Sequence, residues 1–257
     1  MAATNNVQVD SSYWRWLQAA TPVAERLKWC HRTDAFALRD IIRNGCVVPR
    51  MCNVFNEPLI YLFYGRPAYR AQESQQLRLS SRAPVIVIFN NDIEANGSRL
   101  FPFDSGAFDS RYEPWRHHDM KLSEFHMPCG MNAAEKHVSE FFGSRSKYLA
   151  MAPVRPSRSY AGEFEVEAIT EILNDHSAEP ADDRRLAIEL QLGHELKLTN
   201  QDVAAIVIPE SISEAQWLTS WQTGAGAGVQ IRTYPLRPLH AAGHYQAKLE
   251  EICAELV

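Results

Sequence analysis

The chain has 257 residues, of which 46% are hydrophobic and 22% are charged, and its formal net charge at pH 7 is -5. This length fits one large domain or two small ones, and the apolar fraction suffices for a sizeable core. A weakly acidic chain has no global electrostatic attraction to nucleic acid or to membrane surfaces, so only a local basic patch remains for such contacts.

Cysteine usage and the N-terminal residues indicate the compartment. The five cysteines include no Cys-x-x-Cys pair, and an odd, loosely spaced set predicts reduced thiols rather than a disulfide framework. The first residues are polar and lack the apolar core of a signal peptide, and no apolar run approaches the roughly 20 residues of a membrane span. We therefore expect a cytoplasmic protein without a membrane partner.

The N-terminal part of the chain predicts a helix, a strand and a second helix. Ser11 or Ser12 is suited to cap a short amphipathic helix. We interpret residues 27–33 as a strand that ends in a His-Arg-Thr step. Asp34 then provides an N-cap, and the apolar stripe after it predicts a helix that stops at Gly45.

Two further strands are predicted before residue 90. Residues 50–57 are polar and irregular, and residues 58–64 then form a strand that ends at Gly65-Arg66-Pro67, because proline removes a ladder donor. Residues 84–89 are nearly all apolar, which predicts a central strand buried on both faces.

The middle of the chain is harder to interpret. Residues 97–130 hold many aromatics, prolines and glycines without periodicity, and we interpret residues 97–160 as an insertion with a long functional loop. Asn132 is suited to cap a helix over residues 133–142. Residues 162–175 fit either a strand or a helix.

The last third predicts strands over residues 185–192, 203–208 and 229–234, and helices over residues 213–222 and 238–257. Strands and helices do not alternate regularly along the whole chain. This irregular order of strands and helices favours a single α+β domain over residues 1–257 rather than a doubly wound parallel sheet.

Three segments show a motif order that points to a known family. Residues 29–49 read WCHRTDAFALRDIIRNGCVVP, with a histidine in an early strand followed by a helix and a glycine. Residues 57–70 read EPLIYLFYGRPAYR, a strand of aromatics that ends in an arginine-proline turn. Residues 183–198 read DRRLAIELQLGHELKL, and a strand segment over residues 203–212 follows. In order and spacing these segments resemble the ADP-ribosyltransferase fold, and they are most similar to the DarT-like enzymes that modify DNA bases.

The resemblance implies a split mixed or antiparallel sheet surrounded by helices, with NAD as the substrate. It implies an NAD site formed by residues of the two early segments, namely His31, Arg32, Thr33, Tyr61, Tyr64, Arg66, Tyr69 and Arg70. His31 would bond a ribose hydroxyl, with the neighbouring backbone reading the nicotinamide amide, and Tyr61 or Tyr64 would stack on the nicotinamide ring. Arg66 or Arg70 would meet the pyrophosphate, because a guanidinium forms paired hydrogen bonds with phosphate oxygens.

The late segment resembles the part of the family that carries the catalytic glutamate, and it places Glu189 at that position. The resemblance implies a catalytic set of Glu189, His31 and Tyr64, in which Glu189 holds the 2′-hydroxyl of the nicotinamide ribose. Breaking an N-glycosidic bond builds positive charge on the sugar, so a fixed carboxylate beside it stabilises the transition state more than the ground state. Glu195 is the rival. Because strand residues alternate, Glu189 faces away from its two apolar neighbours, and we expect it to face an open cleft.

Two other sets of residues carry candidate chemistry. Six side chains are competent zinc ligands, namely His117, His118, Asp119, His126, Cys129 and His137. Their spacing fits no familiar zinc finger, so we expect a polar loop and no metal site. Residues 144–161 mix cations with aromatics, which suits a phosphate backbone and base stacking, and a solvated loop is the alternative.

The sequence therefore predicts an NAD-dependent mono-ADP-ribosyltransferase of the toxin or phage-defence kind. A DNA base, an RNA base or a protein side chain is the acceptor, and the toxin interpretation leaves an antitoxin or another protein partner open. One alternative is an NAD glycohydrolase that passes the ribosyl group to water. The other is a non-catalytic module on the same fold that binds a nucleotide or a protein.

Overall fold

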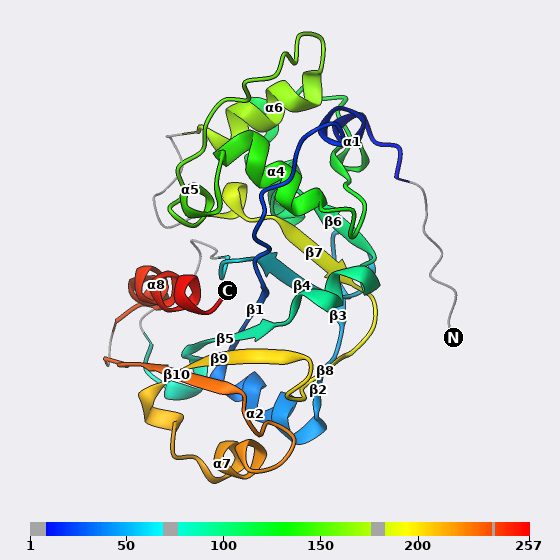
Figure 1. Cartoon of the computed structure of the whole chain (residues 1–257). Coiled ribbons are helices and arrows are strands. Elements are labelled where there is room, and N and C mark those ends of the chain that lie inside the picture. The colour runs from blue at the N-terminus through cyan, green and yellow to red at the C-terminus, as the bar shows by residue number, and fades with distance from the viewer. Residues whose placement is uncertain (1–8, 69–76, 176–182, 238–239) are drawn as a thin grey trace, which may run out of the picture. The chain divides into compact units, whose positions relative to one another are not determined.

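A computed structural model describes residues 9–68, 77–175, 183–237 and 240–257. Within these ranges the chain is an α+β protein with an eight-stranded mixed, mostly antiparallel sheet, a small two-stranded sheet and eight α-helices (Figure 1). The predicted α+β class is therefore confirmed. None of the helices described is long and apolar enough to span a membrane.

Contacts between Cα atoms divide the chain into two compact units. The first unit contains the described parts of residues 1–26, 94–178 and 184–191, and the second contains those of residues 27–93, 179–183 and 192–257. Each unit draws on widely separated parts of the sequence, so neither corresponds to a continuous half of the chain. The prediction of one domain over residues 1–257 stays a prediction.

Most strands belong to the second unit. They are β1 (Trp29–Asp34), β3 (Arg50–Cys52), β4 (Glu57–Tyr64), β5 (Pro84–Phe89), β9 (Val203–Pro209) and β10 (Gln230–Tyr234). They lie in the order β10-β9-β5-β1-β4, with β3 also paired to β4, and every pair is antiparallel except β9 with β10. All six residues of β5 are buried between β1 and β9, which confirms the predicted central strand. The small sheet pairs β2 (Cys46–Val47) with β8 (Leu196–Lys197).

The helices of the second unit pack on this sheet and on each other. In α2 (Ala35–Asn44) the Asp34 carboxylate accepts a hydrogen bond from the N–H of Ala37 at 2.8 Å, as its predicted N-cap. The helix ends at Gly45, whose φ of 71° suits glycine because it has no Cβ. Figure 1 shows α2 side by side with α7 (Gln216–Gln222), against which it packs. The last helix, α8 (Gln246–Leu256), packs on β9 and β10.

The first unit is mainly helical. Its elements are α1 (Ser12–Leu17), β6 (Arg99–Phe101), α3 (Phe108–Arg111), α4 (Ala133–Phe142), α5 (Arg145–Leu149), α6 (Phe164–Leu173) and the start of β7 (Glu189–Leu192). The predicted cap Ser11 accepts a hydrogen bond from the N–H of Trp14 at 3.0 Å, and α1 packs on α4 and α6. The ring of Tyr13 in α1 lies 6.5 Å from that of Phe125 and 6.2 Å from that of Phe141, which forms an aromatic core.

Several boundaries differ from the sequence predictions. The strand predicted over residues 185–192 begins only at Glu189, because Arg184–Leu186 is a 3-10 turn. Residues 50–57 are not wholly irregular, since three of them pair with β4 as β3. The ambiguous residues 162–175 contain the helix α6. The long loop predicted over residues 97–130 contains β6, α3 and several 3-10 turns.

Two helix predictions also need adjustment. The closing helix predicted over residues 238–257 begins at Gln246, after a 3-10 turn at Ala242–Tyr245, and residues 238–239 lie outside the described residues. Asn132 occupies the N-cap position of α4, but its side chain makes no capping hydrogen bond. All five cysteines are free, as the sequence predicted.

Candidate functional site

Glu189, the predicted catalytic residue, lies in the first unit with its carboxyl fully buried. Its Oε1 accepts hydrogen bonds from Ser105 Oγ at 2.6 Å and from Gln191 Nε2 at 2.7 Å. Its Oε2 accepts a bond from the backbone N–H of Ser105 at 3.2 Å. Gln191 in turn accepts a bond from an Nη of Arg99 at 2.9 Å. Both oxygens of the carboxyl are therefore fixed by donors, which holds the side chain in one orientation.

Strand pairing explains why these residues meet. In the antiparallel pair of β6 and β7, Phe101 lies opposite Glu189, so the segment after β6 begins beside the carboxyl. The Asp104 carboxylate accepts a bond from the N–H of Gly106 at 2.9 Å, which turns the backbone at Ser105. Gln191 follows Glu189 by two residues and shares its face of the strand.

Burial determines the charge state of Glu189. It raises the pKa of the Glu189 carboxyl to about 8, and the negative charge of Asp104 adds to this rise. The hydrogen bonds from Ser105 and Gln191 act in the opposite direction and lower the pKa. At pH 7 the carboxyl is therefore mostly protonated in the free protein. The expectation of an open cleft at Glu189 is wrong, because its side chain is enclosed by the cradle of Ser105 and Gln191.

His31 lies on β1 in the second unit and is half-buried. Its Nδ1 is 3.0 Å from the carbonyl oxygen of Tyr61. Because a carbonyl oxygen only accepts, Nδ1 carries the proton and Nε2 carries the lone pair of the neutral ring. Burial lowers the pKa of His31, the charge of Arg50 lowers it further, and the bond to Tyr61 opposes both. His31 is therefore an imidazole whose Nε2 suits a hydroxyl donor.

The two candidate stacking tyrosines have different environments. Tyr64 is 1% exposed, its ring lies 5.0 Å from that of Trp29, and its hydroxyl accepts a bond from the N–H of Leu27 at 2.9 Å. Tyr61 is half-buried and donates its hydroxyl to Cys52 Sγ at 2.6 Å. Since stacking on a ligand requires an accessible ring, the geometry favours Tyr61 and makes Tyr64 a core residue.

Arg66 is buried in an internal ion pair. Its Nη2 lies 2.9 Å from Oδ2 of Asp183 and 3.4 Å from Oε1 of Glu250, and the side chains of Arg66 and Asp183 are only 3% and 1% exposed. The geometry therefore gives Arg66 a structural partner where the resemblance implied a pyrophosphate. Thr33 is half-buried at the end of β1, and Tyr69 and Arg70 lie outside the described residues.

The neighbours of His31 on β1 hold α8 instead of facing Tyr61. Arg32 donates to the side-chain oxygen of Gln246 at 2.6 Å, and Gln246 donates to Glu250 at 2.9 Å. Cys30 is buried in side-chain hydrogen-bonding contact with Cys253. Cys30 and Arg32 therefore share one face of β1, while His31 is directed to the other, as strand alternation requires.

Of the predicted residues, the structure brings His31 together with Tyr61, and it surrounds Glu189 with residues that were not predicted. These are Ser105, Gln191, Asp104 and Arg99. One signal was present for Gln191, which stands two positions after Glu189 in an expected strand. No sequence pattern indicated that β6 pairs with β7. The contact of Ser105 with Glu189 could therefore be found only in the structure.

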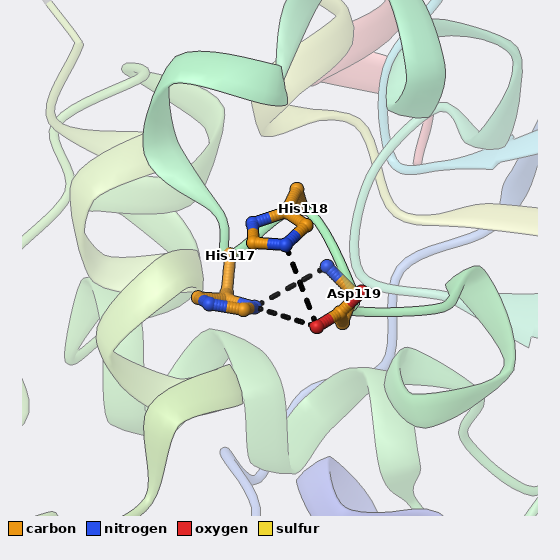
Figure 2. A group of neighbouring side chains, drawn as sticks. All are labelled: His117, His118 and Asp119. Atoms are coloured by element: carbon orange, nitrogen blue, oxygen red, sulfur yellow. Dashed lines mark hydrogen bonds and ion pairs between the residues drawn. The ribbon is translucent and has the colours of Figure 1, made fainter.

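The six zinc-competent side chains do not form one centre. His117, His118 and Asp119 are exposed, and Figure 2 shows their side chains as neighbours. His137 is fully buried, with Nδ1 2.6 Å from the hydroxyl of Tyr13, and burial lowers the pKa of His137 to about 3. Burial lowers the pKa of His126 to about 4, with a contribution from the charge of Arg99.

The basic segment over residues 144–161 is largely paired within the first unit. Arg145 lies 2.7 Å from Glu25, Arg155 lies 2.9 Å from Glu171, and Arg158 lies 3.3 Å from Glu140. Tyr148 is buried against Phe142, with ring centroids 4.9 Å apart. These acidic partners favour a structural segment over a site for a phosphate backbone.

Comparison with known proteins adds no relative, because no family model, no curated protein and no solved structure matches this chain.

Proposed function

We propose that the protein is an NAD-dependent mono-ADP-ribosyltransferase of the toxin or phage-defence type, with an ADP-ribosyltransferase-like split sheet. The observation that carries the proposal is Glu189, a buried carboxyl whose two oxygens are fixed by three hydrogen bonds from Ser105 and Gln191. The late glutamate that the sequence resemblance singled out is thus a fixed group in a buried environment.

The reaction needs such a group. As the bond between nicotinamide and ribose breaks, positive charge develops on the sugar, and a fixed carboxylate stabilises that charge without reorganising. A buried carboxylate interacts more strongly with the charge because the local dielectric constant is low. The ionised form is the active one, and a cationic nicotinamide ribose nearby favours ionisation because opposite charges lower the pKa of a carboxyl.

Recognition of NAD is assigned to His31 and Tyr61, as the resemblance implies. His31 accepts a hydrogen bond from a ribose hydroxyl at Nε2, since Nδ1 is committed to Tyr61. Tyr61, the more exposed of the two tyrosines, stacks on the nicotinamide ring. DNA, RNA or protein supplies the acceptor, and a protein partner such as an antitoxin fits a toxin role.

The test is an assay of the purified full chain with NAD, in which released nicotinamide is measured by chromatography. The assay is run from pH 7 to pH 9, because Glu189 ionises in this range. Labelled NAD is then offered together with DNA, RNA and cell lysate, and label on one of these acceptors supports the transferase.

Two other results of these assays would support the alternative functions. Nicotinamide release without labelled acceptor identifies an NAD glycohydrolase. Binding of NAD without release, at high protein concentration across the pH range, identifies a non-catalytic module and rejects the enzymatic proposal.

A further inference from the structure

Three consecutive side chains of the first unit converge on the surface. The ligand atoms of His117, His118 and Asp119 all lie within 4.8 Å of one another. Oδ2 of Asp119 is 3.5 Å from Nε2 of His118 and 3.8 Å from Nδ1 of His117. Dashed lines mark both pairs in Figure 2. Neighbouring side chains of an extended chain point to opposite sides, so this convergence requires a turn.

Hydrogen bonds within the segment form that turn. The N–H of Met120 donates to the carbonyl oxygen of His117 at 3.0 Å, which closes a four-residue turn around the three side chains. The N–H of Asp119 donates to Nδ1 of His117 at 3.2 Å. In the free protein this bond occupies the one lone pair of Nδ1, so a cation ligated at Nδ1 replaces the Asp119 N–H as its partner.

Arg116 stabilises the turn through hydrogen bonds to its backbone. One Nη of Arg116 donates to the carbonyl oxygens of Met120 at 3.2 Å and His117 at 3.5 Å. Its guanidinium lies 4.2 Å from the ring centroid of Phe108 and 3.1 Å from the Asp109 carboxylate, both on α3. The Arg116 side chain is only 8% exposed. The backbone of the turn is therefore ordered in advance, which reduces the entropy that a ligand would have to overcome.

The three groups match the preferences of a d-block cation. Two imidazoles and a carboxylate are ordinary zinc ligands at about 2.0–2.2 Å, and tetrahedral geometry at that length separates ligand atoms by about 3.4 Å. Two of the separations here, 3.5 and 3.8 Å, are close to that spacing. Calcium and magnesium prefer oxygen ligands, so the imidazoles select against them.

We propose that Nδ1 of His117, Nε2 of His118 and Oδ2 of Asp119 bind a divalent d-block cation, with Zn²⁺ as the best-fitting ion and solvent as the remaining ligand. The side chains of His117, His118 and Asp119 are 60%, 78% and 81% exposed, so water reaches the open position. This proposal revises the sequence prediction that the chain has no metal site, and it is independent of the NAD chemistry.

The test is a titration of the untagged full chain with zinc sulfate, by calorimetry and by competition with a chromophoric chelator. We expect one zinc per chain, undisturbed by an excess of magnesium. His118→Ala and Asp119→Asn each lower the affinity at least about tenfold, since even outer-shell substitutions at metal sites have effects of that size. His194→Ala is the matched control, because His194 is an exposed histidine in the loop between β7 and β8.

Two results overturn the proposal. One is the absence of saturable zinc binding in the wild-type chain. The other is unchanged affinity in the double variant His117→Ala/His118→Ala, which would assign the zinc to thiols or to other histidines. Because all three side chains are exposed, the variants should keep the wild-type circular dichroism spectrum and thermal midpoint, and both are recorded for each variant.

Discussion

The Ser105 hydroxyl lies 2.6 Å from Oε1 of Glu189, and the Ser105 backbone N–H lies 3.2 Å from Oε2 of the same carboxyl. One residue thus contacts both oxygens, and the serine is 2% exposed. The contact does two things. It fixes the orientation of the carboxyl, and it favours the ionised form against the burial that raises its pKa.

We expect Glu189→Gln to abolish nicotinamide release while the fold persists, because an amide keeps the shape of the side chain but has no charge to stabilise the oxocarbenium ion. Rates of the two proteins are compared by chromatography, and folding is checked by circular dichroism. Glu195→Gln is the matched control, because Glu195 is exposed on the loop between β7 and β8. Full activity of Glu189→Gln combined with loss in Glu195→Gln would reassign the catalytic role to Glu195.

The pH dependence of turnover should follow the groups around Glu189. With a pKa of about 8 and an active ionised form, kcat/KM rises with pH through this value. Asp104→Asn removes a neighbouring negative charge and shifts the rise to lower pH. Ser105→Ala removes a hydrogen bond that lowers the pKa, so the rise moves to higher pH. Profiles of wild type and both variants check this, and shifts of the same sign in the two variants would contradict it.

Stability should also depend on the ionisation of Glu189. A folded pKa of about 8, above the ordinary value of 4.5, means that the native state binds the proton more tightly, so the free energy of unfolding falls as pH rises between these values. The lowered pKa values of His126 and His137 act oppositely, but only below their ordinary value of 6.5.

Between pH 6.5 and pH 8 we therefore expect a loss of about 1–2 kcal/mol from Glu189. Urea unfolding at both pH values measures it. Glu189→Gln has no ionisation here and should show a flat dependence, so an equal loss in that variant would assign the slope to another group.

Arg66 provides a test between structural and ligand-binding roles. Because its guanidinium is buried against Asp183, we expect Arg66→Ala to lower the free energy of unfolding by about 3–5 kcal/mol. Arg43→Ala is the surface control, since the pair of Arg43 with Asp40 is exposed and contributes at most about 1 kcal/mol. An Arg66→Lys protein with wild-type stability but weakened NAD binding would instead support contact with the pyrophosphate.

Short sequence patterns, such as capping residues and apolar runs, were sufficient to predict much of the fold. Asp34 and Gly45 fix the ends of α2 through a capping carboxylate and a left-handed backbone, and both properties are visible in the sequence. The apolar run of β5 likewise predicts that this strand is buried on both faces. In contrast, β3 is short and largely exposed, so its residues carry no apolar pattern and its pairing with β4 depends on tertiary structure.

In the candidate site, too, some residues could be predicted from the sequence and others could not. Glu189 and His31 stand in recognisable motifs, but the roles of Arg66 and Ser105 depend on partners far away in the sequence. Arg66 pairs with Asp183, and Ser105 reaches Glu189, across 117 and 84 residues respectively. An exposed arginine and a buried, paired arginine look alike in sequence. The residues around Gly65-Arg66-Pro67 give no indication that a distant carboxylate pairs with Arg66.

The alternation along β1 has a consequence for tolerance to substitution. Cys30 and Arg32 contact α8, while His31 contacts Tyr61 from the opposite face. A saturation scan of this strand that scores abundance and activity separately should therefore show a period of two. Changes at positions 30 and 32 would reduce the amount of folded protein, whereas changes at position 31 would leave abundance near normal and reduce turnover of NAD. One six-residue strand thus separates the positions that contact α8 from the position that we propose binds NAD.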